Sequence, residues 1–304
     1  MTSRTGMAVV LALVSLGAAG CTGTSQETFA TPEAAAEALI RAAEQHDIAA
    51  LRKILGKDGM DLVVTEDAVQ DRNQMTSFAA QARTLTRIDR DSGTASATLV
   101  VGSEEYPVPI PIVEKGGQWR FDTPAGREEV LYRRIGSNEL TAIELCHGFV
   151  EAQLDYASEK HDGSLVNQYA QRIISTPGKQ DGLAWQAADG TWQGPVGEAV
   201  ARVIEEGYTS KAEPYHGYYF KVLKGQGPAA PLGELDFLVE GAMIGGFALV
   251  AAPADYGVTG VKSFIVSHTG IVYEKDLGPT TIDQFKMMER YNPDSAWTPV
   301  PQQP

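Results

Sequence analysis

The sequence predicts an α+β protein of two domains, each with helices packed on a mainly antiparallel β-sheet. Apolar residues recur with a helical period in residues 31–55 and again in residues 124–160, and a period of 2 takes over later in each half. About 280 residues follow a removable N-terminal segment, a length that favours two domains over one. A hydrophobic fraction of 43% excludes wholesale disorder.

Residues 1–20 are predicted to be a signal peptide. Arg4 precedes a short apolar run, and small residues lead into Cys21 in "LGAAGC". The run is too short to span a membrane. The segment resembles a bacterial lipoprotein signal, which implies cleavage before Cys21 and a lipid on its sulfur. The alternative is a plain signal peptide with an incidental cysteine. Residues 21–27 are polar and suit a tether.

The lipoprotein resemblance implies a cell-envelope location. In a Gram-negative cell, Thr22 favours the periplasmic face of the outer membrane; otherwise the outer face of the cell membrane is expected. Removal of residues 1–20 takes Arg4 away and leaves a net charge of −15. The chain has no basic run, which argues against nucleic acid as a partner and against electrostatic binding to anionic lipid. The expected partners are the membrane, through the lipid, and another envelope protein.

The N-terminal domain is predicted to cover residues 28–123. Thr31 is a helix cap and Pro32 suits the first helical position, and a second short helix follows "HD". A weak third helix is expected in "FAAQARTL". Four strands then follow, in "TLTRID", "TASATLVVG", "YPVPIPIV" and "GQWRFDT". The alternating prolines of the third predict an edge strand. This order of elements is similar to the cone-shaped folds of the nuclear-transport-factor-two type.

The C-terminal domain is predicted to cover residues 124–300. It opens with a long helix that Gly136 divides and whose buried face follows Leu140, Ile143, His147, Val150 and Leu154. Shorter helices are expected in "LVNQYAQRI" and "PVGEAVARVIEEG". Strands are then expected in "YHGYYFKVL", "GGFALVAAP", "VKSFIVS" and "GIVYEKD", with glycines in the turns between them. A helix in "PTTIDQFKMMERY" closes the domain.

Two family resemblances rest on these segments. "VPIPIVEKGGQWRFDTPAGREEVLYRRIGSNELTAI", "STPGKQDGLAW", "PYHGYYFKVL" and "GGFALVAAPADYGVTGVKSFIVSHTGIVYEKDLG" resemble the bacterial domain-of-unknown-function 2950 family. That resemblance implies an exported or lipid-anchored protein and brings no activity. "SNELTAIELCHGFVEAQLDYAS" with the later strands is similar to the globular head of type IV pilin-like proteins, although the long apolar N-terminal span of a pilin is missing here.

No catalytic residue, metal ligand or cofactor is predicted. Glu144, His147 and Glu151 share a helix face, but no second Glu-x-x-His exists to complete a metal site. Cys146 and His147 are adjacent on a helix and point about 100° apart, so Cys146 is expected to be a small buried hydrophobe. Ser267 and His268 are expected in a turn. The acids near the end of the long helix, Asp155, Glu159 and Asp162, are expected to be solvated.

The aromatic residues Trp185, Trp192, Tyr215 and Tyr219 are the candidate binding residues, because exposed aromatic rings stack on sugars or on partner chains. The sequence therefore predicts a non-enzymatic binding or structural module on the cell envelope. The alternatives are an envelope hydrolase of unknown substrate and an accessory protein of a pilus or secretion system.

Overall fold

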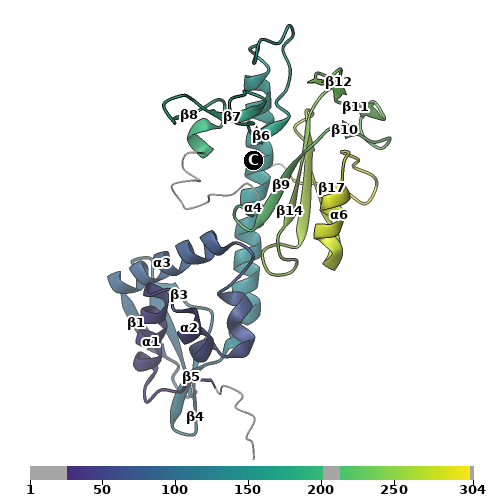
Figure 1. The fold of residues 1–304 in the computed structure, drawn as a ribbon. Coiled ribbons are helices and arrows are strands. Elements are labelled where there is room, and N and C mark those ends of the chain that lie inside the picture. The colour runs from purple at the N-terminus through teal and green to yellow at the C-terminus, as the bar shows by residue number, and fades with distance from the viewer. Residues whose placement is uncertain (1–25, 201–212, 302–304) are drawn as a thin grey trace, which may run out of the picture.

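The computed structural model describes residues 26–200 and 213–301; the predicted signal peptide and Cys21 lie outside them. Two lobes share one long helix, α4 (Thr123–Tyr156), which spans about 50 Å (Figure 1). Helices and antiparallel-rich sheets confirm the predicted α+β class. Among the helices of the described residues, none combines the length and the apolar character that a membrane span requires.

Capping residues fix where the helices of the N-terminal lobe begin. The Thr31 hydroxyl accepts a hydrogen bond from Ala34 N at 3.1 Å, as predicted, and Asp47 and Asp67 cap the next two α-helices in the same way. The buried helix faces, with Leu39 among them, form one core with the sheet. The helices are α1 (Pro32–Glu44), α2 (Ile48–Leu55), the 3-10 helix η1 (Lys57–Leu62) and α3 (Ala68–Thr84), the last longer than predicted.

The prediction that the proline-rich third strand of this lobe is a single edge strand is wrong. Its strands are β1 (Thr86–Arg90), β2 (Ser96–Val101), β3 (Tyr106–Pro107), β4 (Ile112–Lys115) and β5 (Gln118–Phe121), in the order β1-β2-β4-β5 with β3 beside β2. Ile112 pairs with both Ala97 and Phe121, so β4 is an inner strand. The run splits at residues 108–111, which keeps Pro109 and Pro111 out of the inner ladder.

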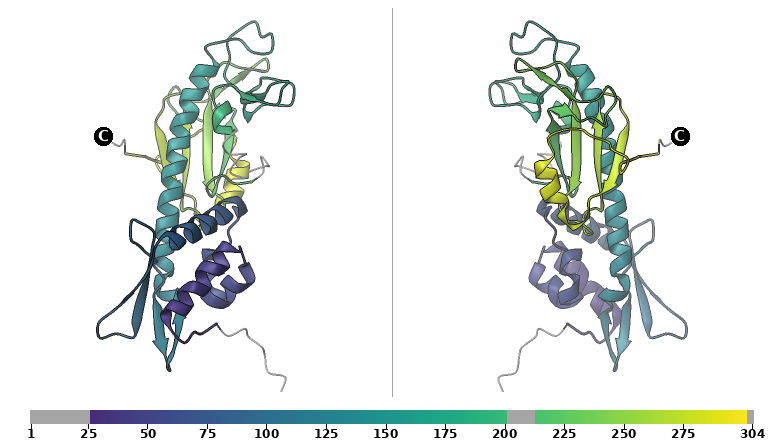
Figure 2. Two further views of the ribbon diagram at one scale, coloured as in Figure 1. Left: turned by 90° about the vertical axis from the view of Figure 1, so that its left-hand side faces the viewer. Right: turned by 90° about the vertical axis from the view of Figure 1, so that its right-hand side faces the viewer.

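The C-terminal lobe is built on one antiparallel sheet. Its order is β17-β16-β15-β14-β9, and β9 is an edge strand. Figure 2 shows α4 along one face and α6 (Thr281–Met287) against the other. The helix predicted to run to Tyr291 ends early, because Tyr291 N instead donates to Gly225 O at 2.9 Å. Four strands match the predicted ones: β9 (Tyr218–Leu223), β14 (Ala248–Pro253), β15 (Lys262–Ser267) and β16 (Val272–Asp276). The short strand β17 (Thr298–Pro299) was not predicted.

Three small sheets lie beyond the end of α4, where the sequence predicted helix or irregular chain. The helix predicted for residues 165–173 is wrong. The buried side chain of Gln153 donates to Ala170 O at 2.9 Å and accepts from Ala170 N at 2.8 Å, which holds this segment extended. The sheets are β6 (Arg172–Ile174) with β7 (Gly182–Gln186) and β8 (Trp192–Gln193), β10 (Gly225–Gln226) with β11 (Leu235–Asp236), and β12 (Leu238–Val239) with β13 (Ala242–Met243).

Helix α4 differs from its prediction in two ways. It passes through Gly136 without a break, because Arg134 and Asn138 on either side are buried and hydrogen-bonded to other elements. Its buried face is also rotated from the predicted one. Leu140, His147 and Leu154 are exposed, and a different stripe enters the core: Ala142, Cys146, Phe149, Gln153 and Tyr156.

The two lobes meet at a buried polar contact, which we call the lobe junction (Asp67, Gln70, Asn138, Gly217, Thr259). Asp67 Oδ2 accepts from Gly217 N at 3.0 Å, Gln70 Nε2 donates to Asn138 Oδ1 at 3.0 Å, and Asn138 Nδ2 donates to Thr259 O at 2.9 Å. Gly217 has φ 74°, and a Cβ there would lie 2.6 Å from Asn138 Nδ2. These bonds join α3, α4 and the start of β9, so they hold the lobes in one arrangement.

Candidate interaction surface

The two predicted tryptophans lie in the small sheet beside the end of α4. Cross-strand register pairs Trp185 with Gln193 and Gln186 with Trp192, so the two indoles face opposite sides of the ribbon. Trp185 is half-buried, and its ring centroid lies 5.5 Å from that of His161. Its Nε1 donates a hydrogen bond to Gln193 Oε1. The structure therefore brings the tryptophans to one end of the molecule without joining them into one aromatic surface.

The two predicted tyrosines lie at the other end of the C-terminal sheet, close to the lobe junction. Tyr219 packs against Phe285 of α6, with ring centroids 6.3 Å apart. Burial raises the pKa of the Tyr219 phenol, and the carboxylates of Glu66 and Asp67 raise it further. Tyr215 is half-buried and packs edge-on against His216. The four predicted aromatic residues are thus divided between two places.

The residues weighed for catalysis lie on two elements, α4 and the end of β15. Cys146 is fully buried, and burial raises the pKa of its thiol to about 12. Ser267 is buried and is the last residue of β15, not part of the turn as expected; its Oγ lies 3.1 Å from Thr269 Oγ1, and His268 begins the turn. Glu144, His147 and Glu151 line an exposed face of α4. Within residues 26–200 and 213–301, no group of three or more His, Cys, Asp or Glu side chains is placed to hold a metal ion.

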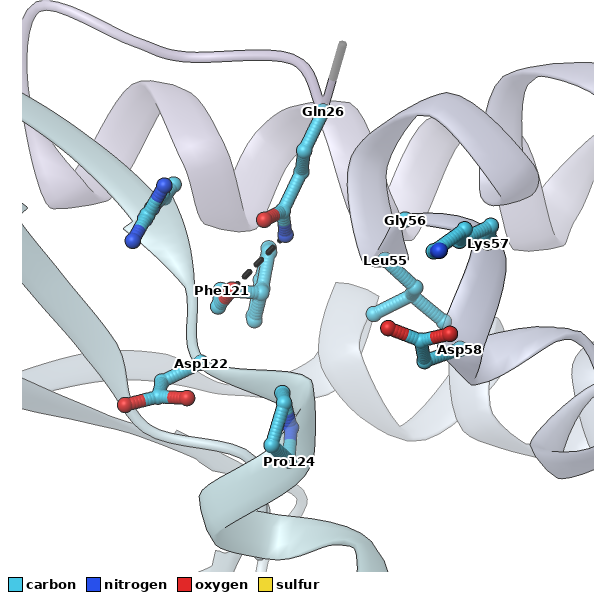
Figure 3. A pocket seen from close by; sticks show the side chains of 9 residues that line it. Gln26, Leu55, Gly56, Lys57, Asp58, Phe121, Asp122 and Pro124 are labelled. Atoms are coloured by element: carbon cyan, nitrogen blue, oxygen red, sulfur yellow. Dashed lines mark hydrogen bonds between the residues drawn. The ribbon is translucent and has the colours of Figure 1, made fainter. Parts of the chain in front are cut away.

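A pocket of about 280 Å³ lies beside the first described residue, at the start of α4 (Figure 3). Gln26 closes one side, where its Nε2 donates to Phe121 O at 2.7 Å and to Ile54 O at 2.9 Å. Two cations and two carboxylates line it, with no Ser, Cys or His among the lining residues. The lining residues are Gln26, Leu55, Gly56, Lys57, Asp58, Arg120, Phe121, Asp122 and Pro124.

Exposed apolar side chains gather at the opposite end, on the loops around β10 to β13 and on the loop that follows α4 (Figure 1). The β15–β16 hairpin reaches the same end, because Ser267 pairs with Ala248, which also pairs with Leu223, just before β10. Of the fourteen large hydrophobic residues that are exposed in the described part of the chain, half lie here. We call this set the distal loop cluster: Leu165, Val166, Leu232, Leu235, Val239, Ile244 and Ile271.

Hydrogen bonds join the loops of this cluster. Tyr169 N donates to Met243 O at 2.8 Å, and Ile244 N donates to Phe237 O at 3.0 Å. The buried side chain of Gln226 donates to Pro231 O and Gly233 O, on both sides of Leu232. The loops therefore present their apolar tips from a fixed backbone.

Leu232 is the most unusual member of the distal loop cluster. Its backbone has φ 71°, a conformation that costs a residue with a Cβ about 1 kcal/mol, and its side chain is 91% exposed. Leu165, on the loop after α4, is 90% exposed. The turn closed by Gly233 N, which donates to Ala230 O at 2.9 Å, has Pro231 before Leu232 and accounts for the positive φ. The exposure of the two leucines makes them candidate contact residues for a partner.

Acidic side chains flank one of the apolar tips, Leu235. Glu234 and Asp236 flank Leu235, and both lie within salt-bridge distance of Arg290, with Arg290 Nη2 2.5 Å from Asp236 Oδ1. All three are substantially exposed. An apolar centre with a charged rim is the usual composition of a protein–protein interface. The sequence did not predict this surface, because a loop sequence does not indicate whether its leucines are exposed or buried. The segment "APLGEL" contains only turn signals.

The fold and this surface define a two-lobed α+β protein in which one shared helix separates the N-terminal end from an apolar end built of loops. A family model described as "Protein of unknown function (DUF2950)" matches residues 26–300, and the chain belongs to this family. This confirms the resemblance seen in the sequence. No curated protein and no solved structure matches the chain. The likeness of the C-terminal half to a pilin head stays a prediction.

Proposed function

We propose that this protein is a lipid-anchored, non-enzymatic binding module of the cell envelope. In this proposal Cys21 carries the lipid and the distal loop cluster binds a partner protein. The observation that supports it best is the position of the cluster, at the far end of a helix of about 50 Å from the first described residue. An anchored protein that recruits a partner has to present its binding surface away from the membrane.

The attachment of Gln26 supports this orientation. Gln26 lies five positions after Cys21, and its side chain bonds to the ends of α2 and β5, next to the start of α4. A lipid on Cys21 would thus keep the N-terminal lobe beside the membrane. Helix α4 and the lobe junction would then direct the distal loop cluster outward. Trp185 and Trp192 lie at the same end and can extend the binding surface.

Metabolic labelling tests the anchor. Cells expressing the full chain are given an alkyne analogue of palmitate, and the protein is recovered and coupled to a fluorophore. We expect labelling of the wild type and its loss in Cys21→Ser. The matched control is Cys146→Ser, which keeps the label because Cys146 is fully buried. Undiminished labelling of Cys21→Ser would contradict the anchor, and the partner-binding part of the proposal would then be judged by crosslinking alone.

The two alternatives predicted from the sequence have less support. The lining of the pocket beside Gln26 contains no serine, cysteine or histidine, so a hydrolase site there would rest on the carboxylates of Asp58 and Asp122. The pilus-accessory alternative predicts that pilus or secretion components are recovered after crosslinking in intact cells. It is compatible with the same distal surface and differs only in the identity of the partner.

A further inference from the structure

A second surface, separate from the distal loop cluster, runs along the solvent side of α4. Its apolar residues follow the 3-4 spacing of a coiled-coil seam, with His147 at the central position. Leu140 and Leu154 are 51% and 55% exposed, and Ile143 and Val150 are half-buried against the core. We call this set the outer seam: Leu140, Ile143, His147, Val150 and Leu154.

Within the described residues of the lobe, three members of the outer seam are left exposed: Leu140, His147 and Leu154. The sheet packs against the other stripe of α4, where small residues such as Ala142 and Cys146 are fully buried. Figure 2 shows this upper part of α4 uncovered on the side away from the sheet. The seam is two heptads long, about 21 Å, which matches the length of a short partner helix.

The charge along this part of α4 restricts the partner. From Ile135 to Tyr156 the helix carries four acids, Glu139, Glu144, Glu151 and Asp155, and no Lys or Arg. Glu144 and Glu151 each follow a seam residue directly and occupy the flanking positions that select a coiled-coil partner by charge. A second copy of the chain would place acids against acids in either orientation, and anionic lipid would be repelled as well.

We propose that the outer seam binds an amphipathic helix of another protein, one with aliphatic residues in its seam and Lys or Arg beside them. The apolar half of the contact comes from Leu140 and Leu154, and the charged half from Glu144 and Glu151. His147, as the polar residue in the middle of an otherwise aliphatic seam, fixes the register of the partner. This inference does not depend on the lipid anchor or on the distal loop cluster.

The test uses two synthetic helical peptides of three heptads, with leucine at both seam positions. One carries lysine at the flanking positions and the other carries glutamate. Each is titrated with the full chain bearing Cys21→Ser, and binding is followed by fluorescence anisotropy. We expect the lysine peptide to bind and the glutamate peptide to bind at least about tenfold more weakly, with salt reducing the difference.

Variants of the chain separate this contact from general attraction to an acidic protein. Leu140→Ser with Leu154→Ser is expected to weaken the lysine peptide at least about tenfold, since both side chains lose their burial in the complex. Glu144→Gln with Glu151→Gln is expected to weaken it several-fold and to flatten the salt dependence. The matched control, Leu165→Ser with Leu232→Ser, removes two exposed leucines elsewhere and is expected to change nothing.

Three results would overturn the proposal. The first is equal affinity for the two peptides, and the second is an unchanged affinity in the Leu140→Ser, Leu154→Ser variant. The third is self-association of the wild type, seen by sedimentation and abolished in that variant, which would mean that a second copy covers the seam. Thermal unfolding checks that the variants are folded, as half-exposed positions predict.

Discussion

The lobe junction and the distal loop cluster are opposite in composition and in burial. At the junction, polar side chains such as Asp67 and Asn138 are almost fully buried and hydrogen-bonded across elements. In the distal loop cluster, Leu165 and Leu232 are almost fully exposed. Buried polar groups cost free energy unless every bond is formed, so they select one geometry. Exposed apolar groups contribute little to folding and are available for binding.

This difference indicates a division of roles along α4. The junction fixes how the lobes are arranged. Under the proposed function, the far end of the helix carries a surface whose burial contributes free energy only when a partner covers it. Changes at the junction should therefore alter stability, and changes at the distal loop cluster should alter binding alone. The predictions below test that division.

The largest effect is expected from Gly217→Ala. The φ of 74° costs an alanine about 1 kcal/mol, and the new Cβ would lie 2.6 Å from Asn138 Nδ2 and 2.8 Å from Thr259 Cβ. We expect a loss of about 3 kcal/mol in the free energy of unfolding, measured with urea. Gly257→Ala is the matched control, because Gly257 has φ 77° and open space around its Cβ position. Equal losses in the two variants would show that the junction contact is unimportant.

The elements that depend on neighbouring residues alone could be predicted from the sequence, and those that depend on contacts between distant residues could not. The cap at Thr31 and the strands between residues 245 and 278 follow from neighbouring residues, and they were predicted correctly. The helix expected at residues 165–173 does not form. The side chain of Gln153, in α4, is hydrogen-bonded to both the N–H and the carbonyl of Ala170, which leaves neither group available for a helical bond. A tertiary hydrogen bond of this kind leaves no periodic pattern.

The two candidate surfaces show the same limit. Helix α4 carries two overlapping apolar stripes, and periodicity favoured the one with Leu140 and Leu154. The structure buries the stripe with Ala142 and Cys146, whose small side chains allow a close approach of α4 to the sheet. Periodicity alone thus favours the more hydrophobic stripe as the core face, whereas in the structure that stripe is the partly exposed outer seam. The distal loop cluster could not be predicted, since exposure of a loop leucine depends on the whole fold.

A smaller and pH-dependent effect is expected at Asp71, next to the junction. Its carboxylate accepts hydrogen bonds from Thr65 N and Oγ1, and burial raises its pKa above the usual value. The charge therefore costs stability at pH 7, and the cost disappears as the pH falls through the raised pKa towards about 4. Asp71→Asn should lose hydrogen bonding worth about 1 kcal/mol at pH 4 and less than that at pH 7.

Asp61 is the control with the opposite sign. Hydrogen bonds from Arg127 lower the pKa of Asp61, so its charge stabilises the fold at pH 7 and this contribution is lost as the pH falls below about 4. Asp61→Asn should thus be most destabilising at pH 7. Urea unfolding between pH 7 and pH 3.5 compares the two variants. A cost of Asp71→Asn that grows with pH would contradict the burial of its charge.

The smallest effect on stability, and the largest on binding, is expected at the distal loop cluster. Leu165→Ser should change the free energy of unfolding by no more than about 0.5 kcal/mol, because the side chain is already in water. Leu183→Ala, at a buried leucine of the nearby strand β7, should lower the free energy of unfolding by about 3 kcal/mol.

Leu232→Gly should raise the free energy of unfolding by about 1 kcal/mol, since glycine accepts a φ of 71° without strain. If this leucine is retained for binding, Leu232→Gly should also reduce the crosslinked adduct formed in intact cells. A variant that is more stable and binds less would show that the strain at Leu232 serves recognition; a more stable variant with an unchanged adduct would remove Leu232 from the interface.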